Sequence, residues 1–124
     1  MTILDYLGIE CLTKNQEEVV LQMTVTQNHL QPFKLMHGGL NAMLIETACS
    51  IGANEYLDNK IKVAIGLDVQ ANHIKSVASG VITTIAKPNH IGGTTQVWEA
   101  SIFNDKNELI SVGRCSLMNK KINY

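Results

Sequence analysis

Glu46 is the residue in this sequence whose setting most strongly suggests chemistry. In a helix, the side chains one turn away from it are Ala42, Met43, Cys49 and Ser50, most of them apolar. Removing a carboxylate from water costs several kcal/mol unless a partner compensates for the loss. The residues alone leave two readings open: a structural glutamate linked to a cap or a water, or a catalytic carboxylate assisted by the Ser50 hydroxyl.

The stretch His37-Gly38-Gly39 provides a second candidate element eight residues before Glu46. Backbone N–H groups in the first turn of a helix lack intrahelical partners, so the Gly38 amide could hold a carbonyl oxygen as it becomes an oxyanion. The alternative is that these glycines only turn the chain into the helix.

The spacing of the two candidates predicts how they must cooperate. At 1.5 Å per residue, Gly38 and Glu46 lie about 12 Å apart along a helix, too far to act on one carbonyl group. If both act, a two-fold dimer must place Glu46 of one subunit beside Gly38 of the other.

One long helix and a set of strands are expected to position these residues. Apolar residues at intervals of three and four predict a helix over 37–57 that is apolar or small on both sides and therefore covered on every side. Alternating patterns predict strands over 9–13, 19–26, 62–74, 79–86, 94–103 and 109–118, with a hairpin turn at 104–107. Strands without a second long helix favour an α+β fold: a curved, mainly antiparallel sheet around one central helix.

Composition excludes several classes of function. A length of 124 residues with 45% hydrophobic content predicts one domain over 1–124. Eleven acidic and ten basic residues, without a basic stripe, argue against nucleic-acid binding, and no apolar run approaches the ~20 residues that span a membrane. Three cysteines without C-x-x-C spacing and no secretory signal predict a cytoplasmic protein, and four scattered histidines predict no metal site.

The segment QPFKLMHGGLNAMLIETACS resembles the active-site signature of hotdog-fold acyl-coenzyme A thioesterases. The similar branch contains 4-hydroxybenzoyl-CoA, phenylacetyl-CoA and 1,4-dihydroxy-2-naphthoyl-CoA thioesterases, the last acting in menaquinone synthesis. GLDVQANHIKS and KPNHIGGTTQVWEASIFND extend the likeness over nearly the whole chain from Val19. The resemblance implies a hotdog fold, hydrolysis of an aromatic acyl-coenzyme A without a cofactor, and a homodimer that could pair into a homotetramer.

The resemblance also implies roles for individual residues. Glu46 matches the nucleophile or general base, Gly38 the oxyanion amide, Gln31 and His37 the groups that orient the carbonyl, and Ser50 the assisting hydroxyl. Contacts with coenzyme A are implied for Gly66, His73, Ile74, Lys75, Ser76, His90, Ile91, Gly92, Gly93, Thr94 and Thr95. Lys75 and Thr94 stand where close relatives have arginine, which would weaken the binding of phosphate there.

Two other functions remain open on the same residues. A hotdog dehydratase would also use a histidine and an acidic residue, here His37 and Glu46, although the spacing of Gln31, His37, Gly38 and Glu46 follows the thioesterase pattern. A non-catalytic acyl-coenzyme A sensor would carry a DNA-binding helix-turn-helix, for which this chain has no room.

Overall fold

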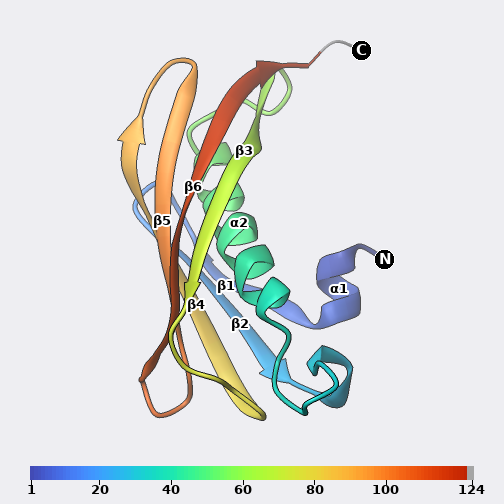
Figure 1. The fold of residues 1–124 in the computed structure, drawn as a ribbon. Helices are drawn as coiled ribbons and strands as arrows, with labels where there is room; N and C mark the ends of the chain where they lie inside the picture. The colour runs from blue at the N-terminus through green and yellow to red at the C-terminus, as the bar shows by residue number, and fades with distance from the viewer. Residues whose placement is uncertain (123–124) are drawn as a thin grey trace.

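A six-stranded antiparallel sheet curves around one long helix in the computed structural model, which describes residues 1–122 (Figure 1). The strand order is β1-β2-β4-β5-β6-β3, so β1 and β3 form the two edges. This is the α+β hotdog arrangement predicted from the sequence. The elements are α1 (Ile3–Leu7), β1 (Ile9–Lys14), β2 (Val19–Val25), η1 (Gln27–His29), α2 (Gly38–Asn54), β3 (Lys62–His73), β4 (Gly80–Ile91), β5 (Thr95–Phe103) and β6 (Leu109–Lys121).

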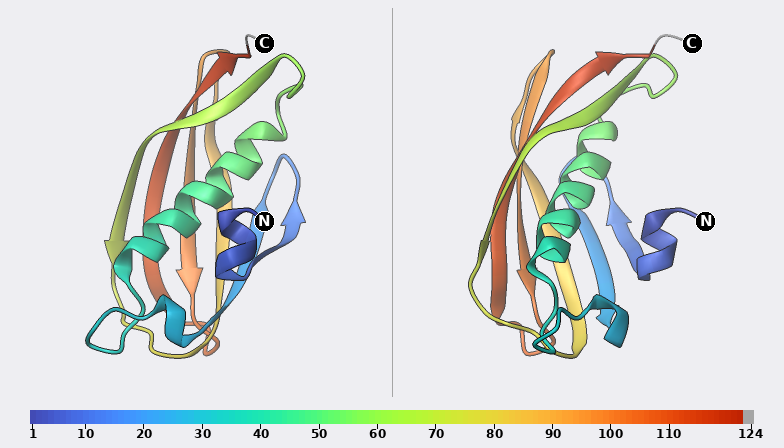
Figure 2. Two further views of the ribbon diagram at one scale, coloured as in Figure 1. Left: turned by 90° about the vertical axis from the view of Figure 1, so that its right-hand side faces the viewer. Right: turned by 45° about the vertical axis from the view of Figure 1, so that its right-hand side comes forward.

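The long helix α2 lies across the concave face of the sheet, as both views in Figure 2 show. Its first turn is capped by His37, whose Nδ1 accepts a hydrogen bond of 2.8 Å from the Gly39 N–H. At its other end, the Asn54 and Gln96 side chains donate hydrogen bonds to the carbonyls of Ser50 and Ala53, at 2.8 and 3.1 Å. Side chains thus satisfy backbone groups at both ends and fix the axis of the helix.

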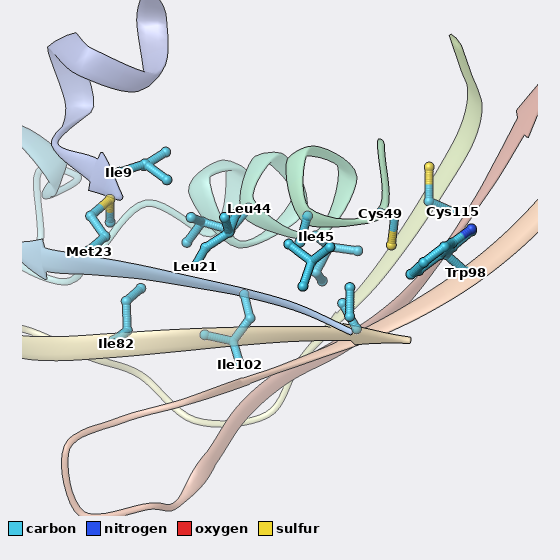
Figure 3. Packing of buried hydrophobic residues seen from close by; sticks show 14 of the residues in the cluster. Ile9, Leu21, Met23, Leu44, Ile45, Cys49, Ile82, Trp98, Ile102 and Cys115 are labelled. Carbon is cyan, nitrogen blue, oxygen red and sulfur yellow. The ribbon is translucent and has the colours of Figure 1, made fainter. Parts of the chain in front are cut away.

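The core lies between α2 and the sheet. Leu44, Ile45 and Cys49 point from the helix toward strand residues such as Leu21 and Trp98 (Figure 3). Each large apolar side chain buried there contributes roughly 1.5–3 kcal/mol. This packing makes α2 a rigid support for the residues along its other faces.

The helix is not covered on every side within one chain, contrary to the sequence expectation. Ala42, Met43, Glu46 and Ser50 are only half-buried, whereas the side that faces the sheet is fully buried. A single six-stranded sheet covers one side of a helix, so the other side needs a further layer to bury it.

Strand β4 continues to Ile91, five residues beyond the predicted end at Ala86. A shift in register between Pro88 and His90 lets the strand pass the proline, which has no N–H for the ladder. The helix ends at Asn54, three residues before its predicted end, and β6 runs to Lys121. In the described residues, no helix has the length and apolar character of a membrane span.

Candidate active site

A cavity opens at the N-terminal end of α2, between the loop that precedes the helix and the segment that follows β3. It brings together several residues that the sequence analysis assigned to the carbonyl or to coenzyme A, far apart along the chain. The lining residues are Gln31, Leu35, Met36, Gly38, Asn41, His73, Ile74, Lys75, Ser76 and Val77.

The Gly38 amide is the first hydrogen-bond donor at this cavity. His37 caps the Gly39 N–H, and no acceptor within residues 1–122 pairs with the N–H of Gly38. An unpaired amide at the positive end of a helix is suited to hold a developing negative charge. Because Nδ1 of His37 accepts a hydrogen bond, the neutral ring carries its proton on Nε2.

Gln31 supplies a second donor. The Phe33 N–H donates a hydrogen bond to Gln31 Oε1, and this bond fixes which way the amide points. Its Nε2 group has no partner among the described residues and is left to donate into the cavity. A tight turn, in which Gln31 N–H donates to Leu35 O at 2.7 Å, holds the residue in place. Lys34 in this turn adopts a φ of 70°, unusual for a residue other than glycine.

Glu46 does not line this cavity. Its carboxylate lies against the Cα of Gly66 on β3, closer than a side chain at that position would allow. Glu46 is half-buried and makes no salt bridge within residues 1–122. Since Gly38 and Glu46 belong to one continuous helix, they are separated by about 12 Å along its axis, as the spacing predicted.

Ser50 lies one turn after Glu46 and faces a shallow depression beside Val63 and Lys14. No hydrogen bond joins its hydroxyl to the Glu46 carboxylate in the part of the chain described. The assisting role implied for Ser50 therefore depends on a water or a substrate between the two groups.

Lys75 is held by an ion pair instead of projecting freely. Its Nζ contacts Glu108 Oε2, and Asn104 donates a 3.0 Å hydrogen bond to the other oxygen of this carboxylate. The hydrogen bond from Lys75 is the main cause that lowers the pKa of Glu108 below its usual value. A phosphate at Lys75 would have to compete with Glu108.

The loop expected to bind coenzyme A over 90–95 lies at the opposite end of α2 (Figure 1). His90 and Ile91 belong to β4, so the true loop is short. Asn119 donates hydrogen bonds to the carbonyls of Gly92 and Gly93, at 3.0 and 3.1 Å. This end of the helix is about 24 Å from Gly38, so the loop and Gly38 of one chain do not form one site.

Two polar residues at these places were missed by the sequence analysis. Asn41 is a buried residue that lines the cavity. It lies on the same helix face as the apolar residues Leu44, Ile45 and Ala48, and this helical spacing could have identified it as a buried polar residue. Asn119 orders the Gly92–Gly93 turn from a neighbouring strand, and no local pattern indicates that contact.

The cysteines play no visible part in the site. Cys49 and Cys115 are fully buried. Burial, followed by the charges of Glu46 and Asp68, raises the pKa of the Cys115 thiol to about 12, and burial is also the main cause that raises the pKa of Cys49. Both thiols remain protonated and fill the core. No cluster of three or more His, Cys, Asp or Glu residues suited to a metal occurs in the described residues.

Comparison with known proteins identifies relatives of this chain. The profile of the thioesterase superfamily matches residues 33–111. A 1,4-dihydroxy-2-naphthoyl-CoA hydrolase of Listeria monocytogenes is 36% identical over 121 residues, covering 98% of this chain and 98% of that protein.

Two solved structures extend this comparison to the fold. A variant of a Staphylococcus aureus thioesterase superposes with a TM-score of 0.93 at 36% identity, over 95% of this chain and 98% of that chain. A Haemophilus influenzae thioesterase superposes with a TM-score of 0.92 at 32% identity, over 99% of this chain and 85% of that chain. The chain therefore belongs to the thioesterase superfamily and is a hotdog-fold thioesterase.

Proposed function

We propose that this enzyme hydrolyses an aromatic acyl-coenzyme A to the free acid and coenzyme A, with Glu46 as its nucleophile or general base. One observation carries the proposal. The cavity at Gly38 holds free hydrogen-bond donors but no carboxylate, while Glu46 lies about 12 Å along the same helix without a partner among the described residues. Acyl transfer needs both, so a second subunit completes each site.

The free edge of β3 supports such a dimer. This edge strand has 12 residues, and Ile65 and Leu67 on it are 41% and 59% exposed. A long apolar edge promotes pairing with another strand. Along β3, Gly66 contacts Glu46 and His73 contacts Gly38. Two β3 strands can pair antiparallel so that Gly66 of each lies opposite the partner's His73. This pairing would bring each Glu46 carboxylate toward the cavity of the other subunit.

The chemistry follows from these positions. The carbonyl oxygen accepts from the Gly38 N–H, oriented by Gln31 and His37, so that negative charge developing on it is stabilised. In the nucleophilic route, a Glu46 oxygen attacks the carbonyl carbon, the C–S bond breaks, and water then hydrolyses the mixed anhydride. In the general-base route, Glu46 takes a proton from a water that attacks directly. In both, the thiolate leaves and is protonated by solvent.

The substrate class rests on the cavity and on the relatives. Leu35, Met36, Ile74 and Val77 supply apolar surface for an acyl group. The relatives named 1,4-dihydroxy-2-naphthoyl-CoA hydrolase point to a bicyclic aromatic acyl group and to menaquinone biosynthesis. Coenzyme A is a part of the substrate, no separate cofactor is required, and three free cysteines fit a cytoplasmic enzyme.

The contacts with coenzyme A proposed from the family pattern divide between the two ends of each subunit. Gly66, Ile74 and Ser76 lie on β3 or just beyond its end, whereas the turn at Gly92 and Gly93 lies near the C-terminal end of α2. In the antiparallel dimer, that turn of one subunit lies toward the Gly38 end of the other.

A thiol-release assay tests the activity. Benzoyl-, 1-hydroxy-2-naphthoyl-, acetyl- and palmitoyl-coenzyme A are offered, and faster release from the aromatic thioesters is expected. Glu46→Ala should lower turnover by ~10³-fold while the circular dichroism spectrum and the oligomer persist. Full activity of this variant would refute the role of Glu46, and formation of a double bond without thiol release would indicate a dehydratase.

Mixing two inactive variants tests the shared site. Glu46→Ala and Gln31→Ala subunits are unfolded together and refolded. If each site combines Glu46 of one subunit with Gln31 of the other, half of the dimers are mixed and each has one intact site, so about a quarter of wild-type activity should return. A site contained within one chain would regain none, because each chain carries one substitution.

A further inference from the structure

We propose that Asn41 is a positioning residue that orients His73 so that its Nε2–H donates a second hydrogen bond to the thioester carbonyl beside the Gly38 amide. The inference rests on the proposed function and deepens it. It also gives His73 a different task from the coenzyme A contact that the family resemblance implies.

His73 is anchored by one ring nitrogen only. Its Nδ1 lies 3.3 Å from Asn41 Nδ2 and 3.4 Å from Ser111 Oγ, whereas its Nε2 has no partner within residues 1–122. Asn41 comes from α2, His73 from the end of β3 and Ser111 from β6, so three elements meet at this ring. The contacts hold the ring while leaving Nε2 available to a ligand.

The hydrogen-bond network favours a proton on Nε2. Ser111 Oγ donates its proton to the Asn72 carbonyl at 3.1 Å, so toward His73 it can only accept, and its distance of 3.4 Å from Nδ1 lies beyond the usual length of such a hydrogen bond. The shorter contact of Nδ1, with Asn41, decides which ring nitrogen carries the proton. The hydrogen on Nδ1 would require Asn41 to turn its amide around, leaving an NH₂ group without an acceptor in a residue that is 5% exposed. With the Asn41 NH₂ group facing His73, only the Asn41 oxygen is left unpaired. Buried carbonyl oxygens without a partner are less rare in proteins than buried N–H groups without one. Nδ1 therefore accepts from Asn41, and Nε2 is a donor.

Nε2 lies within reach of the oxygen held by Gly38. A Cβ built on Gly38 would come 2.9 Å from His73 Nε2. Because a Cβ is about 2.5 Å from its own backbone nitrogen, the Gly38 nitrogen and Nε2 are no more than about 5.4 Å apart. An oxygen accepting from two donors at about 3 Å each can bridge that separation. The same geometry explains why residue 38 is a glycine, since a side chain would collide with the ring.

A purely structural role does not explain Asn41, because its buried amide lowers the stability of the fold. Its Oδ1 is buried and lacks a partner in the described chain, and such a group costs roughly 1–3 kcal/mol. A leucine of similar size would fill the space between α2 and the sheet without that cost. The amide is explained by its one polar contact, which is with His73.

The tautomer of His73 is the direct test. Long-range ¹H–¹⁵N spectra of the ligand-free enzyme, assigned with a His73→Gln variant, should show the proton on Nε2 in the wild type. Asn41→Asp replaces the donor with an acceptor and should move the proton to Nδ1. A wild-type ring with its proton on Nδ1 would overturn the proposal. This measurement needs no substrate, so it stands apart from any failure of the proposed hydrolysis.

Kinetics with benzoyl-coenzyme A test the consequence. His73→Ala should lower kcat by about 10²-fold with little change in KM, and Asn41→Leu by about tenfold. In the His73→Ala background, Asn41→Leu should have no further effect, because it acts through that ring. Thr84→Val is the matched control, since Thr84 is the other residue within 1–122 that has a buried unpaired oxygen, and it lies outside the site. Equal losses from Asn41→Leu in both backgrounds would refute the mechanism.

Discussion

Replacing Gly66 with alanine should move the Glu46 carboxylate, the proposed catalytic group, without altering it chemically. A Cβ at position 66 would lie well within 3.0 Å of Glu46 Oε2, a separation that real Cβ atoms do not show. The carboxylate must therefore retreat by about 1 Å, and a displacement of that size can reduce an enzymatic rate by ~10²-fold. This loss corresponds to roughly 2.7 kcal/mol of transition-state stabilisation.

The assay is thiol release from benzoyl-coenzyme A by purified Gly66→Ala, compared with the wild type. The expected result is a fall in kcat of about 10²-fold with a smaller change in KM, because the displaced group acts on the bound thioester. Mass measurement in solution accompanies the assay, since Gly66 lies on the edge strand proposed to form the dimer.

A double-substitution cycle separates displacement of Glu46 from other effects. If Gly66→Ala acts by displacing Glu46, it should cause no further loss in a Glu46→Ala background. Unchanged kcat in Gly66→Ala, or an equal loss in both backgrounds with an intact oligomer, would refute the placement of Glu46 against Gly66 as the functional geometry.

Three further predictions concern the dimer, the loop before α2 and the buried thiols. Leu67→Glu on the free edge of β3 should weaken the dimer by about 10²-fold or more, measured by analytical ultracentrifugation, whereas Leu12→Glu on the opposite edge should leave it intact. Lys34→Gly should raise the free energy of unfolding by up to about 1 kcal/mol in urea, because Lys34 has a φ of 70°. Lys106→Gly in a turn without this strain should give no such gain. Because burial raises the pKa of Cys115 to about 12, the unfolded chain loses this proton first as the pH rises above about 9. Stability should then fall with rising pH, and less steeply in Cys115→Ala.

The main elements could be predicted because their patterns are local. Alternation along 62–74 and 109–118 and the helical spacing over 37–57 match β3, β6 and α2 to within three residues at each end. The exception is β4, which passes through Pro88 by a shift in register that only its partner strand determines. The proposal of a second subunit also rests on the sequence, since helix geometry fixes the separation of Gly38 and Glu46.

Other features of the site depend on which elements become neighbours. Nothing local to β3 indicates that it pairs with β6 at the edge of the sheet, the arrangement that lays Gly66 against Glu46. The ion pair of Lys75 with Glu108 joins residues 33 positions apart, and it was not anticipated.

The sequence by itself determined the fold class and the family, and it supplied the proposed site residues, because periodicity and motif spacing are properties of short stretches of chain. The tertiary structure alone decided the meeting of Asn41, His73 and Ser111, the burial of Asn41, and the separation of the Gly92–Gly93 turn from Gly38. These depend on strand order and on the direction in which α2 crosses the sheet. A pattern of alternating residues records which side of an element is buried, but not which other element buries it.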